Sequence, residues 1–155
     1  MKKSVKITLI IIFVIFVVIQ MFRPDRISKP VDTNLDYISY VQITPELKGM
    51  IDRACKDCHT YQTEWPWYSN IAPVSWFIVH DVNEGREHIN LSEYGRYPVD
   101  KQIRILEEMC EEIQDNEMPL KMYKFMHSEA KLTDEEKQQL CEFLNPNKYL
   151  LKKRK

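Results

Sequence analysis

The sequence CKDCH at residues 55–59 constrains the fold of this chain more than any other stretch. Cys55 and Cys58 are three residues apart, and His59 follows the second cysteine directly. This is the attachment pattern of c-type haem. Two thiols about one helical turn apart can each add across one of two neighbouring vinyl groups, and the adjoining imidazole is left beneath the iron as its proximal ligand. The motif predicts one haem c, attached covalently through Cys55 and Cys58, with His59 bound to the metal.

Three other interpretations of the motif account for less of the sequence. A thioredoxin-like redox pair follows a β-strand, and no strand is predicted before Cys55. A structural zinc site needs a fourth ligand and usually a second cysteine pair, whereas Cys110 and Cys141 are isolated and far apart in the sequence. A disulfide between Cys55 and Cys58 leaves His59 unexplained.

Length and charge limit the remaining possibilities. The chain has 155 residues, of which 44% are hydrophobic, and this is enough for one domain with a single core. The 22 basic and 23 acidic residues nearly cancel, so the composition predicts no nucleic-acid partner. Residues 148–155 are expected to be a solvated basic tail, because the charged run at 152–155 has no interleaved aromatic side chains of the kind that nucleic-acid surfaces carry.

The N-terminus differs from the rest in kind. Residues 7–22, ITLIIIFVIFVVIQMF, carry no charge and follow Lys2, Lys3 and Lys6. Sixteen helical residues at ~1.5 Å each span roughly 24 Å, which the stem of Lys6 can extend towards a bilayer width. The run is followed by Arg23 and not by a small-residue cleavage site. Residues 1–23 are therefore predicted to be an uncleaved transmembrane helix, followed by a tether at 24–40.

The rest of the chain predicts an all-α domain over residues 41–147. Helices are expected from the N-cap Thr44 to about residue 54, over residues 73–89, from Asp100 to about residue 113, and from Thr133 to residue 144. Apolar residues recur at helical spacing, and Thr133 with Glu136 has capping-box spacing. No segment shows the alternation of a half-buried strand.

Two segments resemble the bacterial haem-binding-domain family of small single-haem cytochromes c. They are RACKDCHTYQTEWPWYSNIAPVSWFIVHDVNEGREHINLSEY, at residues 53–94, and MPLKMYKFMHSEAKLTDEE, at residues 118–136. The resemblance extends over roughly residues 40–144. It implies a cytochrome c-like fold in which a few helices surround one haem and the first and last helices of the domain cross.

Met118 is the predicted sixth ligand of the iron. Pro119 keeps Met118 out of helical geometry and places its thioether on a loop. The resemblance implies the same residue, because similar cytochromes offer a methionine just before a proline. The alternatives are that Met118 only fills the core, that the sixth position is open, or that one of three histidines binds there, namely His80, His88 and His127.

Further residues are candidates for contact with the cofactor. Trp65 and Trp76 can cover the haem face, or they can be ordinary core aromatics. Arg86 can pair with a haem propionate, or it can be a surface arginine. Cys110 and Cys141 are expected to be buried free thiols, with a disulfide between them as the alternative.

These features together predict a membrane-anchored monohaem c-type cytochrome that carries single electrons. Haem attachment of this kind occurs outside the bacterial cytoplasm, so the domain is expected on the periplasmic side of the inner membrane, where it meets redox proteins. No paired acid and base is evident, and an enzyme is not predicted. The alternatives are a haem sensor or peroxidase-like protein with an open or displaceable sixth position, and a haem-bearing subunit of a larger complex.

Overall fold

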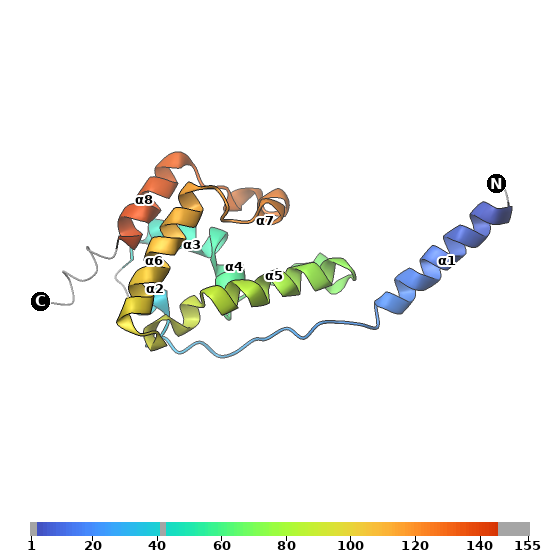
Figure 1. The fold of residues 1–155 in the computed structure, drawn as a ribbon, viewed down its shortest axis with the longest axis horizontal. Helices are drawn as coiled ribbons and strands as arrows, with labels where there is room; N and C mark the ends of the chain where they lie inside the picture. Colours follow the sequence, from blue (N-terminus) through green and yellow to red (C-terminus); the bar gives the residue numbers. More distant parts are fainter. Residues whose placement is uncertain (1–2, 41–42, 146–155) are drawn as a thin grey trace, which may run out of the picture.

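The computed structural model describes residues 3–40 and 43–145, and within them all regular elements are helical (Figure 1). The all-α prediction is therefore confirmed. The predicted domain limits at 41 and 147 and the basic tail at 148–155 lie outside the described residues. The elements are α1 (Lys3–Ile19), α2 (Tyr37–Tyr40), α3 (Pro45–Ala54), α4 (Lys56–His59), η1 (Trp67–Asn70), α5 (Val74–His88), η2 (Leu91–Arg96), α6 (Val99–Gln114), α7 (Lys121–Met126), η3 (Ser128–Ala130) and α8 (Asp134–Leu144).

The starts of two helices follow from their capping residues. The Thr44 side chain accepts a hydrogen bond from the Leu47 amide at the start of α3. At the start of α8, the Thr133 hydroxyl accepts from the Glu136 amide at 3.2 Å, and the Glu136 carboxylate accepts from the Thr133 amide at 2.9 Å. This is the predicted capping box. The predicted N-cap Asp100 is wrong, because α6 begins at Val99 directly after Pro98.

The core of the domain forms where α3, α6 and α8 meet. Helix α8 packs along α6 and also contacts α3 (Figure 1). The buried apolar cluster draws on these helices and on α2 and η2, through Tyr37, Met50, Ile51, Ile89, Leu91, Tyr94, Ile105, Leu106, Ile113, Leu140 and Leu144. Burial of so much apolar surface is the main force that holds these short helices together.

Helix α1 was predicted to be part of a transmembrane segment at residues 1–23. In the structure it is 17 residues long and its side chains are mostly exposed. It extends away from the helical domain (Figure 1). Within residues 3–40 and 43–145, no helix combines the length and the apolar character that a membrane crossing requires. The predicted transmembrane helix is therefore not supported.

The segment after α1 follows the surface of the domain, and we call residues 20–29 the N-terminal strap. The Gln20 side chain bonds both the amide and the carbonyl of Ala72, at 2.9 and 3.0 Å. The Trp76 indole donates to the Phe22 carbonyl at 2.6 Å. The end of the segment predicted to be a transmembrane helix, at Gln20 and Phe22, is thus hydrogen-bonded to residues at and just before the start of α5.

The end of the predicted tether belongs to the core. Tyr37 is only 1% exposed, and its ring contacts that of Tyr94 with centroids 4.8 Å apart. The Gly95 amide donates to the Leu35 carbonyl at 2.8 Å. A Cβ at Gly95 would lie 3.0 Å from the Cα of Leu35, so a glycine permits this close approach. The packed domain therefore begins before residue 41.

A disulfide joins α6 to α8. Cys110 and Cys141 are bonded, with their Cα atoms 4.9 Å apart. The expectation of two free thiols is therefore wrong. The physical reason is the packing of α8 along α6, which brings two cysteines that are 31 residues apart in sequence into bonding range.

Removal of this disulfide should destabilise the haem-loaded protein. A bond that closes a loop of this length is expected to contribute about 2–4 kcal/mol, mainly by restricting the unfolded chain. We expect a Cys110→Ser/Cys141→Ser protein to unfold at a clearly lower urea concentration than the wild type. Urea titration followed by circular dichroism measures the difference. An unchanged midpoint would contradict the expectation, and thiol counting in denaturant verifies that the wild-type bond is present.

Candidate functional site

One cavity of about 630 Å³ lies beside the CKDCH motif. Its volume is within the ~300–1,000 Å³ that is usual for cofactor sites. It is bounded by the α3–α4 junction, by α5, by α6 and by the segment that leads from α6 into α7. The residues that line it are Ala54, Cys55, Cys58, His59, Asp81, Glu84, Gly85, His88, Ile89, Glu108, Met109, Glu112, Ile113, Met118, Pro119, Leu120, Tyr123 and Leu132.

The end of α3 delivers the two thiols to the cavity. Helix α3 stops at Ala54, Cys55 forms the junction, and the single turn of α4 carries Cys58 and His59. Both cysteines are free thiols. Burial raises the pKa of Cys55 to about 12 and the pKa of Cys58 to about 11, so both are uncharged at neutral pH.

The ring of His59 is oriented by two carbonyl groups of the chain. Its Nδ1 lies 3.0 Å from the carbonyl oxygen of Gly85 and 3.0 Å from that of Ile89. Both neighbours can only accept, so Nδ1 carries the proton and donates it. Nε2 is then left with its lone pair for a metal, and carbonyl partners of this kind fix the orientation of metal-binding histidines.

Burial also keeps His59 in the form that binds iron. The pKa of His59 is lowered, chiefly because burial disfavours the charged imidazolium, although the two carbonyl contacts act in the opposite direction. The neutral imidazole is the form that coordinates metals. Ring orientation, tautomer and charge therefore all agree with metal ligation.

Gly85 allows α5 to approach the motif closely. A Cβ at this position would lie 3.1 Å from the Cys58 carbonyl oxygen and 3.4 Å from the Cys58 Cβ and the His59 Cε1. Those distances are shorter than most contacts of real Cβ atoms, and the first is to backbone that cannot easily move. A glycine at residue 85 thus brings its own carbonyl within reach of the His59 ring.

Met118 lines the same cavity from the loop between α6 and α7. Its amide donates to the Glu112 carbonyl at 3.1 Å, which anchors this loop to the end of α6. The following Pro119 is buried and is joined through a cis peptide bond. Met109 also lines the cavity, but it packs against the hydrophobic core. The thioether of Met118 is therefore the one that comes from a loop and not from a core helix.

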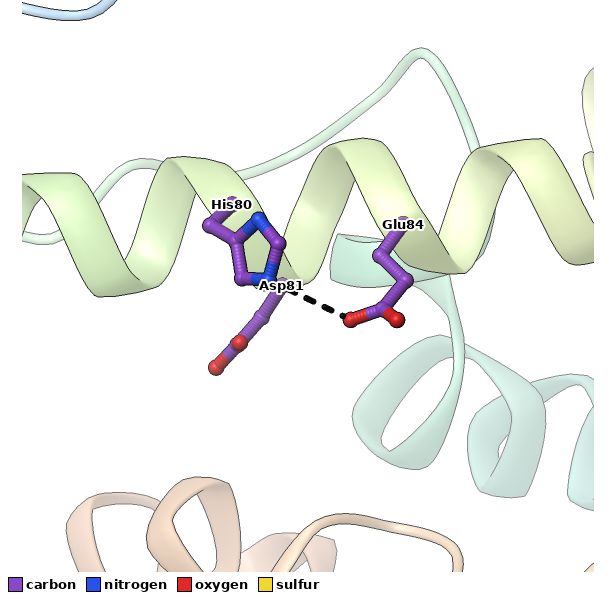
Figure 2. A group of neighbouring side chains, drawn as sticks. All are labelled: His80, Asp81 and Glu84. Carbon is purple, nitrogen blue, oxygen red and sulfur yellow. Dashed lines mark ion pairs between the residues drawn. The ribbon is translucent and has the colours of Figure 1, made fainter.

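The three histidines considered as alternative ligands lie in different surroundings. Only His88, at the exposed end of α5, lines the cavity. His80 does not, and its Nε2 lies 3.5 Å from a carboxylate oxygen of Glu84 in an exposed ion pair (Figure 2). Asp81 completes a group whose potential ligand atoms lie within 4.8 Å of one another, but such exposed groups are common without a metal. His127 contacts Tyr68 and Tyr123 outside the cavity wall.

Trp65, Trp76 and Arg86 do not line the cavity. The Arg26 guanidinium lies 4.7 Å from the centre of the Trp65 ring, and Trp76 bonds the strap at Phe22. Arg86 is buried and donates to Thr60 O, Ile27 O and Thr63 Oγ1, at 2.6–2.8 Å. These three residues therefore fasten the N-terminal strap and the loop after α4. The sequence around these residues gives no local sign that they contact the N-terminal strap.

The sequence did not single out Tyr123, which also lines the cavity. Its hydroxyl donates to the Asp57 carboxylate at 2.8 Å, and Asp57 lies between the two cysteines of the motif. A single tyrosine five residues after Met118 has no periodic or motif signal. Only the folding of α7 back onto α4 brings Tyr123 and Asp57 together.

The donor set fits a covalently bound haem. Two neutral thiols, a histidine with a fixed tautomer and a loop thioether all line one cavity. Apolar side chains such as Ala54, Ile89, Ile113 and Leu132 make up much of the remaining wall. This is the surrounding that a large, flat, apolar macrocycle requires.

Comparison with known proteins gives one positive finding. A family model described as a haem-binding domain matches residues 14–146, which is most of the chain. No curated protein and no solved structure matches the chain significantly.

Proposed function

The chain belongs to the haem-binding domain family, and we propose that it is a single-haem c-type cytochrome that carries electrons one at a time. The observation on which this depends is the set of side chains around one cavity. Cys55, Cys58, His59 and Met118 come from two separate parts of the sequence, and all four line the same apolar space. These residues would hold a haem through two thioether bonds and two iron ligands.

Each of these residues has a specific role in the proposal. Cys55 and Cys58 would hold the macrocycle through two thioether bonds, one from each thiol to a vinyl group. His59 would bind iron through Nε2, because its Nδ1–H is bonded to Gly85 O and Ile89 O. Met118 would bind iron through its sulfur. A haem held in this way supplies reversible one-electron exchange with little change in coordination.

The surroundings favour a carrier over an enzyme in this proposal. Two protein ligands leave no iron position for a substrate, and a thioether ligand raises the reduction potential. The mostly apolar wall limits the entry of water and raises the potential by disfavouring extra charge on the iron, whereas the carboxyl groups of Asp81, Glu84, Glu108 and Glu112 on the same wall act in the opposite direction. A haem sensor or peroxidase-like protein would instead need Met118 to be absent from the iron or easily displaced.

We further propose that the haem domain works outside the cytoplasm, on the periplasmic side of the bacterial inner membrane. The disulfide between Cys110 and Cys141 supports this compartment, since such bonds form and persist in oxidising surroundings. Cys55 and Cys58, in contrast, are free thiols, as haem attachment requires.

Carbon monoxide tests the proposed function directly. The purified haem protein is reduced, and its absorption spectrum is recorded before and after addition of carbon monoxide. A carrier with His59 and Met118 both bound should give an unchanged spectrum. A spectrum that changes at once would mean an open or displaceable sixth position, and it would favour the sensor or peroxidase-like alternative.

A further inference from the structure

We propose that Tyr123 is a positioning residue that holds the Met118 loop over the iron by latching it to the haem-attachment turn. The inference rests on the proposed function, because it assigns Met118 to the iron. It concerns residues 118–126, here called the distal segment, and the turn of α4. The latch is the hydrogen bond between the Tyr123 hydroxyl and the Asp57 carboxylate.

The latch joins two parts of the cavity wall that are far apart in the sequence. The Tyr123 hydroxyl donates to Asp57 Oδ2 at 2.8 Å across a separation of 66 residues. Asp57 lies between Cys55 and Cys58, so its position is tied to that of the attached macrocycle. Tyr123 and Met118 both line the cavity. A hydrogen bond to a charged acceptor is stronger than one between neutral groups, and this one spans the two sides that must hold a haem between them.

The Asp57 carboxylate is also held in place by hydrogen bonds that do not involve Tyr123. The Glu64 amide donates to Asp57 Oδ1 at 2.9 Å, and the Thr63 hydroxyl donates to the Asp57 carbonyl at 2.6 Å. The other carboxylate oxygen is thereby presented to Tyr123. Burial raises the pKa of Tyr123, and its bond to Asp57 raises it further, so the hydroxyl keeps the proton that it donates.

The ring of Tyr123 is positioned separately from its hydroxyl. The His127 ring stacks on it, with centroids 4.3 Å apart and planes 27° apart. On its other side, His127 Nε2 lies 3.3 Å from the Tyr68 hydroxyl. A phenylalanine at residue 123 can therefore keep the stacking while it loses the hydroxyl's bond to Asp57 at 2.8 Å and its longer contact with the Arg53 carbonyl at 3.5 Å.

The distal segment has only a few ties besides this one. At its start, the Met118 amide bonds the Glu112 carbonyl. Beyond its end, Arg53 Nε donates to the Glu129 carbonyl at 2.7 Å. Between these points, Pro119 is buried and Lys124 Nζ donates to the Asn116 carbonyl at 3.2 Å, whereas Met122, Phe125 and Met126 are exposed. Loss of the Tyr123 hydroxyl should therefore loosen the Met118 loop without unfolding the domain.

Imidazole competition tests the latch. Oxidised haem protein is titrated with imidazole, which competes with the Met118 sulfur for iron, and binding is followed in the absorption spectrum. We expect Tyr123→Phe to bind imidazole roughly tenfold more tightly than the wild type, since a hydrogen bond to a charged group no longer holds the loop closed. Tyr68→Phe is the matched control. It removes a hydroxyl from the same aromatic cluster and should leave the affinity unchanged.

Asp57→Ala provides an independent variant of the same latch. It should also tighten imidazole binding. The addition of Tyr123→Phe to it should have little further effect, because the Tyr123–Asp57 bond is already lost and only the 3.5 Å contact with the Arg53 carbonyl remains to be removed. Wild-type affinity in Tyr123→Phe would overturn the latch, as would an equal effect of Tyr68→Phe or full additivity with Asp57→Ala.

The two levels of the proposal fail in different ways. If Met118→Ala binds imidazole no more tightly than the wild type, then Met118 is not the sixth ligand and the proposed function fails with the latch. If Met118→Ala binds much more tightly while Tyr123→Phe matches the wild type, then the ligand assignment survives and only the latch is wrong.

Discussion

Replacement of His59 by alanine should reduce the haem content of the purified protein by more than tenfold. His59 is the histidine whose Nδ1–H is bonded to two backbone carbonyls, so its Nε2 is aimed and uncharged before metal arrives. Loss of even an outer hydrogen-bond partner of a metal ligand typically costs 10–100-fold in metal affinity. Loss of the ligand itself should cost more while the haem is still held reversibly, before its vinyl groups have reacted with Cys55 and Cys58. Absorbance of the haem per mole of polypeptide measures the effect.

His88→Ala is the matched control for this prediction. His88 also lines the cavity, but it lies at the exposed end of α5. We expect the His88→Ala protein to keep its haem content and its spectrum. Wild-type haem content in His59→Ala, or its loss in His88→Ala, would contradict the assignment of the proximal ligand.

Replacement of Met118 by leucine should lower the reduction potential by on the order of 0.1 V, because a thioether ligand stabilises reduced iron. The reduced variant should also bind carbon monoxide, unlike the wild type. Leucine and methionine have similar volumes, so the cavity stays filled and the change isolates the sulfur. Redox titration followed by absorbance measures the potential.

Met109→Leu is the corresponding control, because Met109 lines the same cavity from α6. Its sulfur is expected to fill space in the core and not to bind iron. The Met109→Leu protein should keep the wild-type potential and should not bind carbon monoxide. The reverse result would be a lowered potential and carbon monoxide binding in Met109→Leu, with neither change in Met118→Leu. It would mean that the sixth ligand comes from α6 and not from the loop.

Local signals in the sequence were sufficient for much of the fold. Thr44 with Pro45, and Thr133 with Glu136, marked two helix starts because capping depends only on residues within one turn. The interior of α6 was harder to predict. Gln102 is buried there, because its side-chain amide donates to the carbonyls of Tyr94 and Tyr97. No property of a glutamine in sequence indicates that its side chain will bond carbonyls in the preceding turn.

The strap and the disulfide could not be predicted for the same reason. The contact of Gln20 with Ala72 and the bond between Cys110 and Cys141 join segments that meet only in the folded chain. Residues 24–40 were predicted to be a tether because they contain prolines and lack helical periodicity, and such sequences are often linkers without contacts to a domain. Arg86 illustrates what that prediction missed, because its guanidinium bonds the strap at the Ile27 carbonyl.

Some residues of the candidate site could be identified from the sequence, and others only from the fold. Cys55, Cys58 and His59 share a motif, and Met118 precedes a proline, so their chemistry was readable from neighbouring residues; the structure brings all four to one cavity. Their roles towards haem remain predictions. The contributions of Gly85 and Tyr123 required the fold, since one depends on a close helix approach and the other on a hydrogen bond across 66 residues.

The central claim is that the haem is bonded covalently to Cys55 and Cys58, and extraction of the denatured protein tests it most directly. Protein produced with an intact haem-attachment system is unfolded in acid and extracted with an organic solvent, and the colour of both fractions is measured. The account predicts that the pigment stays with the polypeptide, and that it moves to the solvent when both cysteines are replaced by alanine. Pigment that leaves the wild-type chain, or a wild-type protein that never acquires colour, would contradict the account.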